Sequence, residues 1–179
     1  MVILSQDEQT VSRFRALMED VKIAYGLTEE NYVEGVSDIR NINEGIDSII
    51  RQAYWAQAVA EIEDEETKWY KDLGVYKLII SDIHASSIAE YMETYLEPLF
   101  DDSEKDQELL HTAIEYILAK GDSHKTAERL FCHKNTIRYR LGKIQEKLDP
   151  TVNEREFYQN LAMAIKIYLL LEKYKQDCI

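Results

Sequence analysis

The stretch SHKTAERLFCHKNTIRYRLGKI, residues 123–144, decides the fold of the C-terminal part of the chain. The apolar positions that predict its helices are Ala127 and Leu130 in the first, and Ile137, Leu141, Ile144 and, just beyond the stretch, Leu148 in the second. The last four are spaced by four, three and four residues, which places them on one face of a helix. Residues 131–133 separate them from the first two. Two short helices joined by so short a turn predict a helix-turn-helix unit.

The same stretch differs in charge from the rest of the chain. Between Lys120 and Lys147 there are eight basic and three acidic residues, a net charge of +5. The whole chain has 179 residues, of which 21 are basic and 34 acidic, so its net charge is −13. The remainder therefore carries −18. A basic surface on an acidic protein predicts a polyanionic partner that contacts this one face.

A helix-turn-helix unit docks the N-terminal half of its second helix in the major groove of DNA, while its first helix crosses the backbone. At about 100° per residue, polar side chains of the second helix point away from its apolar face. We expect base reading by Asn135, Thr136, Arg138 and Tyr139. Arginine can bind guanine through two hydrogen bonds, asparagine can bind adenine in the same way, and threonine can touch a thymine methyl group. We expect phosphate binding by Lys125, Arg129, His133, Lys134 and Lys143.

Composition limits the other classes of function. The apolar content of 45% and its helical spacing predict a folded chain, and no apolar run reaches the roughly 18 residues of a membrane helix. The sequence has only two cysteines and no secretory leader, so we expect a cytoplasmic protein without a membrane partner. We see no nucleophile–base pair, phosphate-binding glycine loop or metal-ligand cluster. The expectation is a protein that is not an enzyme and has no catalytic residues, metal site or cofactor.

The N-terminal part has a different pattern. We expect short strands over residues 1–5 and 32–38, and helices over 7–25 and 43–60, which together form a β-α-β-α unit. The acidic run over residues 61–66 is typical of a solvated linker or loop, and we place a domain boundary there. The predicted domains are therefore residues 1–66 and 67–179.

The C-terminal domain is expected to be helical throughout. Apolar stripes predict one helix that includes residues 88–99, another over 109–118, and a final long helix that begins near Phe157. Gly121 is expected to close the second of these as the residue just after its cap. The predicted class is α+β and predominantly helical, with a small, partial β-α-β-α unit followed by an all-α helix-turn-helix domain.

The residues of the C-terminal domain resemble a known family. Leu109-Leu-His-Thr-Ala-Ile-Glu-Tyr-Ile-Leu118, followed by the run from Lys125 to Ile144, is similar to the C-terminal DNA-binding domain of PucR-type and sugar-diacid-regulator (CdaR) transcription factors. The family pattern is a leucine-rich helix and then a run resembling KTAxxLFxHxNTxRYRLxxI. Phe131 is part of this pattern, at a turn position where other helix-turn-helix units favour glycine. The resemblance covers about residues 70–171 and implies DNA binding.

Residues 1–60 resemble, more faintly, the second half of the GGDEF-like domain that precedes the DNA-binding domain in that family. The resemblance rests on Gly35-Val-Ser and on Gln52-Ala-Tyr-Trp-Ala-Gln-Ala. The Gly-Gly-Asp/Glu-Glu-Phe turn and the metal-binding acids of a diguanylate cyclase are not present in the sequence. We therefore expect a degenerate, partial domain and a chain that is a fragment or a truncated paralogue. We expect the part that senses an effector, an unidentified small molecule, to lie outside this sequence.

The leading hypothesis is a sequence-specific DNA-binding transcriptional regulator. Because one helix reads too few base pairs for a specific site, we expect a homodimer on double-stranded DNA with inverted half-sites. The alternative is a protein-interaction module that docks its basic helix on an acidic partner.

Overall fold

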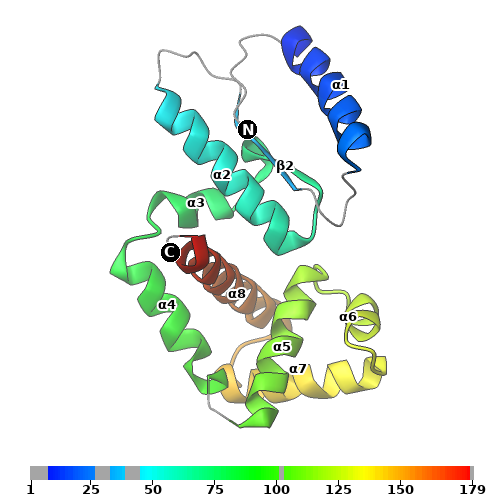
Figure 1. Cartoon of the computed structure of the whole chain (residues 1–179). Coiled ribbons are helices and arrows are strands. Elements are labelled where there is room, and N and C mark those ends of the chain that lie inside the picture. The colour runs from blue at the N-terminus through cyan, green and yellow to red at the C-terminus, as the bar shows by residue number, and fades with distance from the viewer. Residues whose placement is uncertain (1–7, 27–32, 39–44, 101–102, 178–179) are drawn as a thin grey trace. The chain divides into compact units, whose positions relative to one another are not determined.

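The computed structural model describes residues 8–26, 33–38, 45–100 and 103–177 (Figure 1). The chain divides into two compact units, residues 1–81 and 82–179. Most of the described chain is helical, and the strands form a small two-stranded sheet. The predominantly helical α+β class is confirmed. None of the helices in the described ranges is both long enough and apolar enough to cross a membrane.

The first unit is built on a β-α-β arrangement. Its elements are α1 (Glu8–Tyr25), β1 (Glu34–Val36), α2 (Ile46–Glu63), β2 (Thr67–Trp69), the 3-10 helix η2 (Tyr70–Asp72) and α3 (Tyr76–Ser81). Strands β1 and β2 are parallel, with Gly35 opposite Lys68. Parallel neighbours need a crossover connection, and α2 supplies it. A Cβ on Gly35 would lie 2.0 Å from the Ala53 carbonyl oxygen, so only glycine lets β1 approach α2 this closely.

These elements match the predicted helices and the second predicted strand, while the strand expected over residues 1–5 lies outside the described residues. The acidic run has a different role from the one expected. Helix α2 continues to Glu63, Asp64 takes a left-handed conformation, and Lys68 of β2 binds both Glu63 and Glu65. The run therefore contains the last residues of α2 and the turn that joins α2 to β2. Because β2 pairs with β1, the first compact unit continues past the acidic run as far as Ser81.

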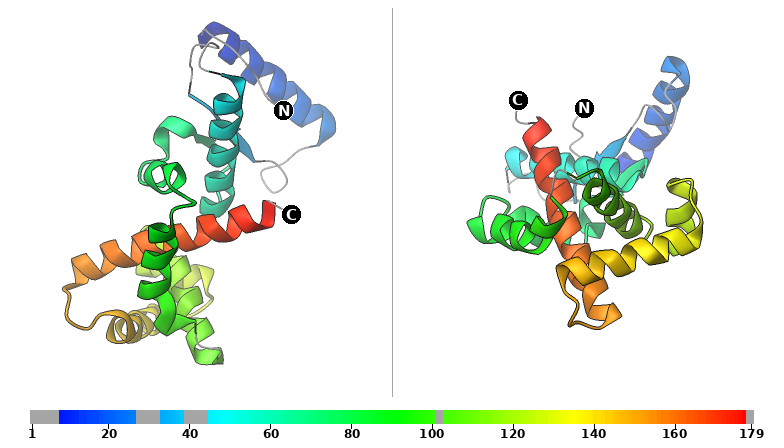
Figure 2. Two further views of the ribbon diagram at one scale, coloured as in Figure 1. Left: turned by 90° about the vertical axis from the view of Figure 1, so that its left-hand side faces the viewer. Right: turned by 90° about the horizontal axis from the view of Figure 1, so that it is seen from below.

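The second unit is all helical. Its elements are α4 (Ser86–Leu96), the 3-10 helix η3 (Glu97–Leu99), α5 (Glu104–Leu118), α6 (Ser123–Arg129), α7 (Lys134–Leu148) and α8 (Glu154–Asp177). Helix α8 runs between α4 and α5 and contacts both (Figure 2). Its fully buried residues Leu161, Ile165 and Leu170 fill the centre of the unit. Helix α5 also contacts α6 and α7, so it holds the predicted helix-turn-helix pair against this core.

The end of α5 departs in one respect from the prediction. The residue after the cap is Lys120, with φ of 57°, and Gly121 follows with φ of 81°. The Lys120 and Gly121 N–H groups donate to the carbonyl oxygens of Ile117 and Tyr116, so the left-handed turn begins one residue earlier than expected. Glycine is needed at 121 because a Cβ there would lie 2.9 Å from the Tyr158 ring.

Candidate nucleic-acid interface

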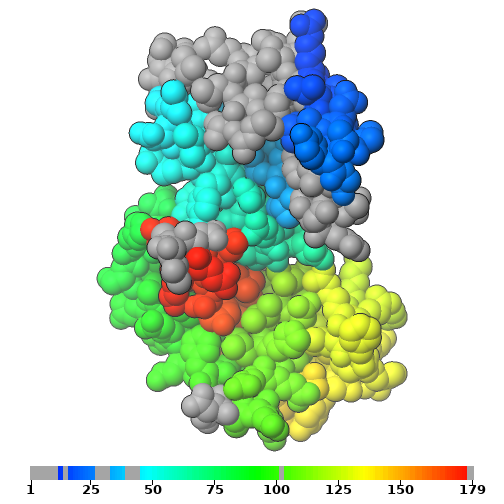
Figure 3. All heavy atoms as spheres, in the orientation of Figure 1, coloured from blue at the N-terminus to red at the C-terminus, as the bar shows by residue number. Residues whose placement is uncertain are grey.

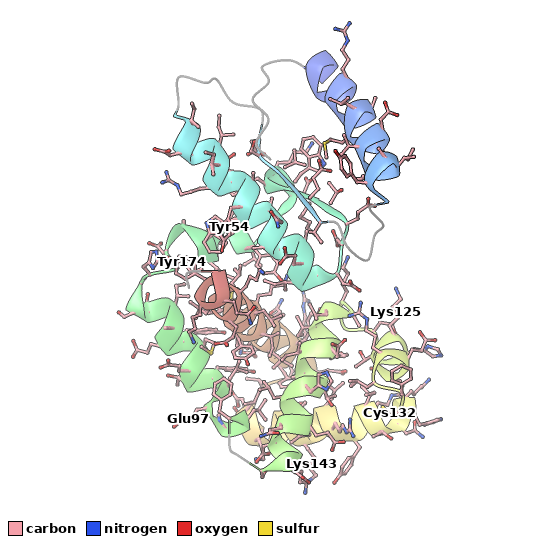
Figure 4. The ribbon with its side chains drawn as sticks, viewed as in Figure 1. Tyr54, Glu97, Lys125, Cys132, Lys143 and Tyr174 are labelled. Atoms are coloured by element: carbon pink, nitrogen blue, oxygen red, sulfur yellow. The ribbon has the colours of Figure 1, made fainter. Side chains whose placement is uncertain are left out.

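Helix α6 is fixed at its start by a side-chain cap. The Asp122 carboxylate accepts hydrogen bonds from the backbone N–H groups of His124, at 2.8 Å, and Lys125, at 3.2 Å. These bonds hold the pKa of Asp122 below its ordinary value. Thr126 and Ala127 are buried on the inner side of the helix, whereas Lys125 is exposed. The cap therefore sets the start of a short helix that presents Lys125 outward (Figure 4).

The turn after α6 contains residues 130–133. The Phe131 N–H donates to the Glu128 carbonyl and the Cys132 N–H to the Ala127 carbonyl, which is the Schellman pattern. Phe131 occupies the left-handed position of this pattern, with φ of 50°, and its residue surface is 97% exposed. A left-handed backbone costs a non-glycine residue about 1–2 kcal/mol. The turn thus joins the two helices through hydrogen bonds that do not use the Phe131 ring.

His133 caps the start of α7. Its ring Nδ1 accepts a hydrogen bond from the backbone N–H of Asn135 at 3.2 Å. A neutral imidazole that accepts at Nδ1 carries its proton on Nε2. The exposed His133 ring can therefore satisfy the helix end and still donate from Nε2 to another group. Sequence reasoning selected His133 for phosphate binding but did not identify its capping role.

Helix α7 has the two faces that its sequence predicts. Ile137 and Ile144 are fully buried, and Leu141 and Leu148 are half-buried. The exposed residues include Asn135, Arg138, Tyr139 and Gly142, whereas Thr136 is half-buried. The base-reading candidates therefore lie within the first half of α7. Figure 3 shows α6 and α7 side by side, in yellow to orange, at one edge of the second unit.

Three basic residues of the helix-turn-helix segment are bound by acids of α5. Arg140 contacts Glu108 and also donates to the Thr112 hydroxyl at 3.3 Å. Arg129 lies 3.2 Å from Glu115, and Lys147 lies 2.5 Å from Asp106. Sequence reasoning missed these pairs. Its available signal was the seven-residue spacing of Glu108 and Glu115, which puts two acids on one face of a helix.

The remaining candidate cations differ in how free they are. Lys143 forms an ion pair with Glu146 at 2.6 Å, which raises the lysine pKa, and its ammonium lies 5.9 Å from the centre of the Tyr139 ring. Lys125, Lys134 and Arg138 are exposed. Within the described part of the chain, none of these three side chains has an ion-pair partner. Lys125 lies on α6, and Lys134 and Arg138 lie near the beginning of α7, so both helices present positive charge to solvent.

The residues that the structure describes contain no group of three or more His, Cys, Asp or Glu side chains that could hold a metal ion. The candidate site is two helices joined by a four-residue turn, with a buried inner face and with free cations on α6 and in the first half of α7. This arrangement defines a helix-turn-helix domain.

Comparison with known families agrees with this class. Residues 109–167 match the family described as the PucR C-terminal helix-turn-helix domain. Residues 109–167 are therefore similar to the PucR-type helix-turn-helix domain that the sequence pattern resembles.

Individual relatives are regulators or uncharacterized. The chain is 31% identical over 84 residues to the purine catabolism regulatory protein of Bacillus subtilis, covering 47% of this chain and 16% of the relative. It is 30% identical over 105 residues to the proline-responsive transcriptional activator PutR of Bacillus subtilis, which covers 58% of this chain and 25% of that relative. It is 49% identical over 51 residues to an uncharacterized protein of Haemophilus influenzae, which covers 28% of this chain and 13% of that relative. The chain thus spans a quarter or less of the length of these relatives. No solved structure matches it significantly.

Proposed function

We propose that the chain acts as a sequence-specific DNA-binding transcriptional regulator and that α7 enters the major groove. The observation that carries this proposal is the set of free cations, Lys125, Lys134 and Arg138, around the start of α7 in a chain whose net charge is −13. An acidic protein with such a surface attracts a polyanion to that face and repels it elsewhere. The two Bacillus relatives are named as regulators, which supports the same function.

Two groups of residues divide the work of binding. Asn135, Thr136, Arg138 and Tyr139 read base edges, because they lie near the start of α7, where a recognition helix contacts bases. Lys125, Lys134 and the Nε2 of His133 contact phosphates, because they are exposed on α6, at the first residue of α7 and at its cap. Arg129 and Lys143 can contribute only if they leave Glu115 and Glu146, so their part in phosphate binding is smaller.

The proposal includes a homodimer on inverted half-sites, spaced by about one helical turn, roughly 34 Å. It places the protein in the cytoplasm, which agrees with the regulator relatives and the absence of a spanning helix among the described residues. It also interprets residues 1–66 as part of a degenerate GGDEF-like domain. The packing of α2 against β1 within this range supports that interpretation.

Selection of genomic fragments by the full chain, followed by sequencing, tests the proposal. We expect enrichment of fragments that contain paired inverted half-sites. Two or three phosphates neutralised by each protomer give a slope of log K against log salt of about −4 to −5 for a dimer. Fragments retained without a shared sequence, or no retention at low salt, would contradict it. The alternative function, docking of the basic helix on an acidic protein partner, would then be favoured.

A further inference from the structure

Phe131 is the most exposed large apolar residue in the described part of the chain, at 97%. It lies between Leu130 and Cys132, which are both half-buried, and it precedes the helix cap His133. The ring therefore points away from the packed interior of its own unit. No described residue covers it.

The backbone at Phe131 adds a second unfavourable feature. Its φ of 50° lies in the left-handed region, where glycine or asparagine is the usual residue. The turn between α5 and α6 has the same hydrogen-bond pattern but uses Lys120 at this position, whose long polar side chain suits solvent. A strained, exposed phenylalanine stabilises neither its turn nor its core. An outlier of this kind points to a function outside the fold.

We infer that the Phe131 ring is a DNA contact, which packs on the apolar deoxyribose edge of the strand bordering the groove that α7 enters. The inference rests on the proposed function. Charge favours DNA as the partner, because Lys134 follows the ring closely in sequence and Lys125 lies on the preceding helix, and both are exposed and without an ion-pair partner in the described chain. A DNA strand alternates phosphates with apolar sugars, which matches a ring flanked by cations.

A sugar contact has a distinctive energetic signature. The deoxyribose is the same at every position, so losing the ring weakens all sequences equally. The ring neutralises no phosphate, so its loss leaves the salt slope unchanged. Because the left-handed backbone is relieved and no packing is removed, the folded domain loses no stability. Loss of binding, an unchanged slope and a melting temperature that does not fall are expected together.

The test measures binding of the full chain to a selected fragment and to a scrambled duplex by fluorescence anisotropy, over a series of salt concentrations. Phe131→Gly and Phe131→Asn should both bind the two duplexes about tenfold more weakly, the loss expected for part of a phenylalanine surface. Phe131→Tyr should bind like the original chain. Asparagine tolerates the left-handed backbone, so agreement between the Gly and Asn variants excludes added loop flexibility as the cause.

Two matched variants complete the design. Leu78→Ala removes another exposed apolar side chain, 69% exposed and in the first unit, and should leave binding unchanged. Lys134→Ala should reduce the salt slope by about one per protomer, a change the Phe131 variants should not show.

Three results would overturn the inference. Phe131→Gly and Phe131→Asn could bind as tightly as the original chain, in which case the ring does not touch DNA. They could keep their DNA affinity and lose self-association in ultracentrifugation, which would assign the ring to a protein interface. If the original chain itself binds neither duplex, the proposed function fails as well, and that outcome is distinct from the other two.

Discussion

The two halves of α7 carry similar charge but use it differently. In the attached half, defined here as residues 140–148, Arg140 and Lys147 are held by Glu108 and Asp106 of α5. In the free half, residues 134–139, Lys134 and Arg138 have no ion-pair partner among the described residues. A count of basic residues treats these halves as equal. The structure separates cations that attach the helix to its domain from cations that are available to a ligand.

Ile137→Asp should have the largest effect, because it disrupts the packing on which both halves of α7 depend. Ile137 is fully buried in the packing of α7, and an aspartate there would place an unpaired charge in an apolar site. We expect a loss of more than about 4 kcal/mol in the free energy of unfolding, which exceeds the usual range for point variants. Circular dichroism melts of the full chain measure it. Gly142→Ala, on the exposed face with open space around it, serves as the control and should not destabilise the helix.

Arg138→Ala tests the free half of α7. If Arg138 binds a guanine through two hydrogen bonds, its loss should cost about 1–3 kcal/mol at the cognate site and relax the preference at one base pair. Lys134→Ala, a phosphate candidate in the same half, should instead weaken cognate and random duplexes by the same factor. Anisotropy titrations with both duplexes distinguish these results. Equal losses in both titrations for Arg138→Ala would make it a phosphate contact and leave base reading to Asn135, Thr136 and Tyr139.

Arg140→Ala tests the attached half of α7. The arginine spans the Glu108 carboxylate and the Thr112 hydroxyl, so its removal frees one face of α7 from α5. Because Glu108 is exposed, we expect a loss of only about 1 kcal/mol in stability. The salt slope of DNA binding should stay the same, since this cation is already neutralised. A slope reduced by one per protomer would show that Arg140 contacts a phosphate and that the two halves do not differ in this way. Arg140→Lys keeps the charge but lacks the forked guanidinium, so its stability should lie between that of the original chain and that of Arg140→Ala.

The sequence predicts the buried face of the helix-turn-helix better than the ion pairs on its surface. The spacing of Ile137, Leu141 and Ile144 is set by helix geometry, so the buried face of α7 and the turn before it were predictable. The ion pairs with α5 join residues up to 41 positions apart, and only the packing of three helices brings them together. Sequence reasoning therefore counted Arg129 as free. Whether the candidate residues bind DNA stays a prediction.

The smallest expected effect concerns pH and the Lys147–Asp106 pair. The bond from Lys147, helped by the Ser103 hydroxyl at 2.8 Å, holds the pKa of Asp106 below its ordinary value. A carboxyl group with a lowered pKa in the folded state stabilises the protein above its unfolded pKa, about 3.9 for aspartate. That stabilisation is lost as the pH falls through the folded value. Asp106→Asn should therefore lower the melting temperature near neutral pH and reduce its dependence on pH in acid.

Lys147→Ala provides the matched variant for this pair. Removing the lysine should bring the pKa of Asp106 back toward its ordinary value, so the acid-dependent part of the stability should shrink as it does in Asp106→Asn. The double variant should then add little to either single one. Part of the acid dependence should persist in all three, because Asp122 and Asp149 also have lowered pKa values from their own hydrogen bonds. An acid profile identical to that of the original chain in Asp106→Asn would show that the Lys147 pair does not stabilise the attached half of α7.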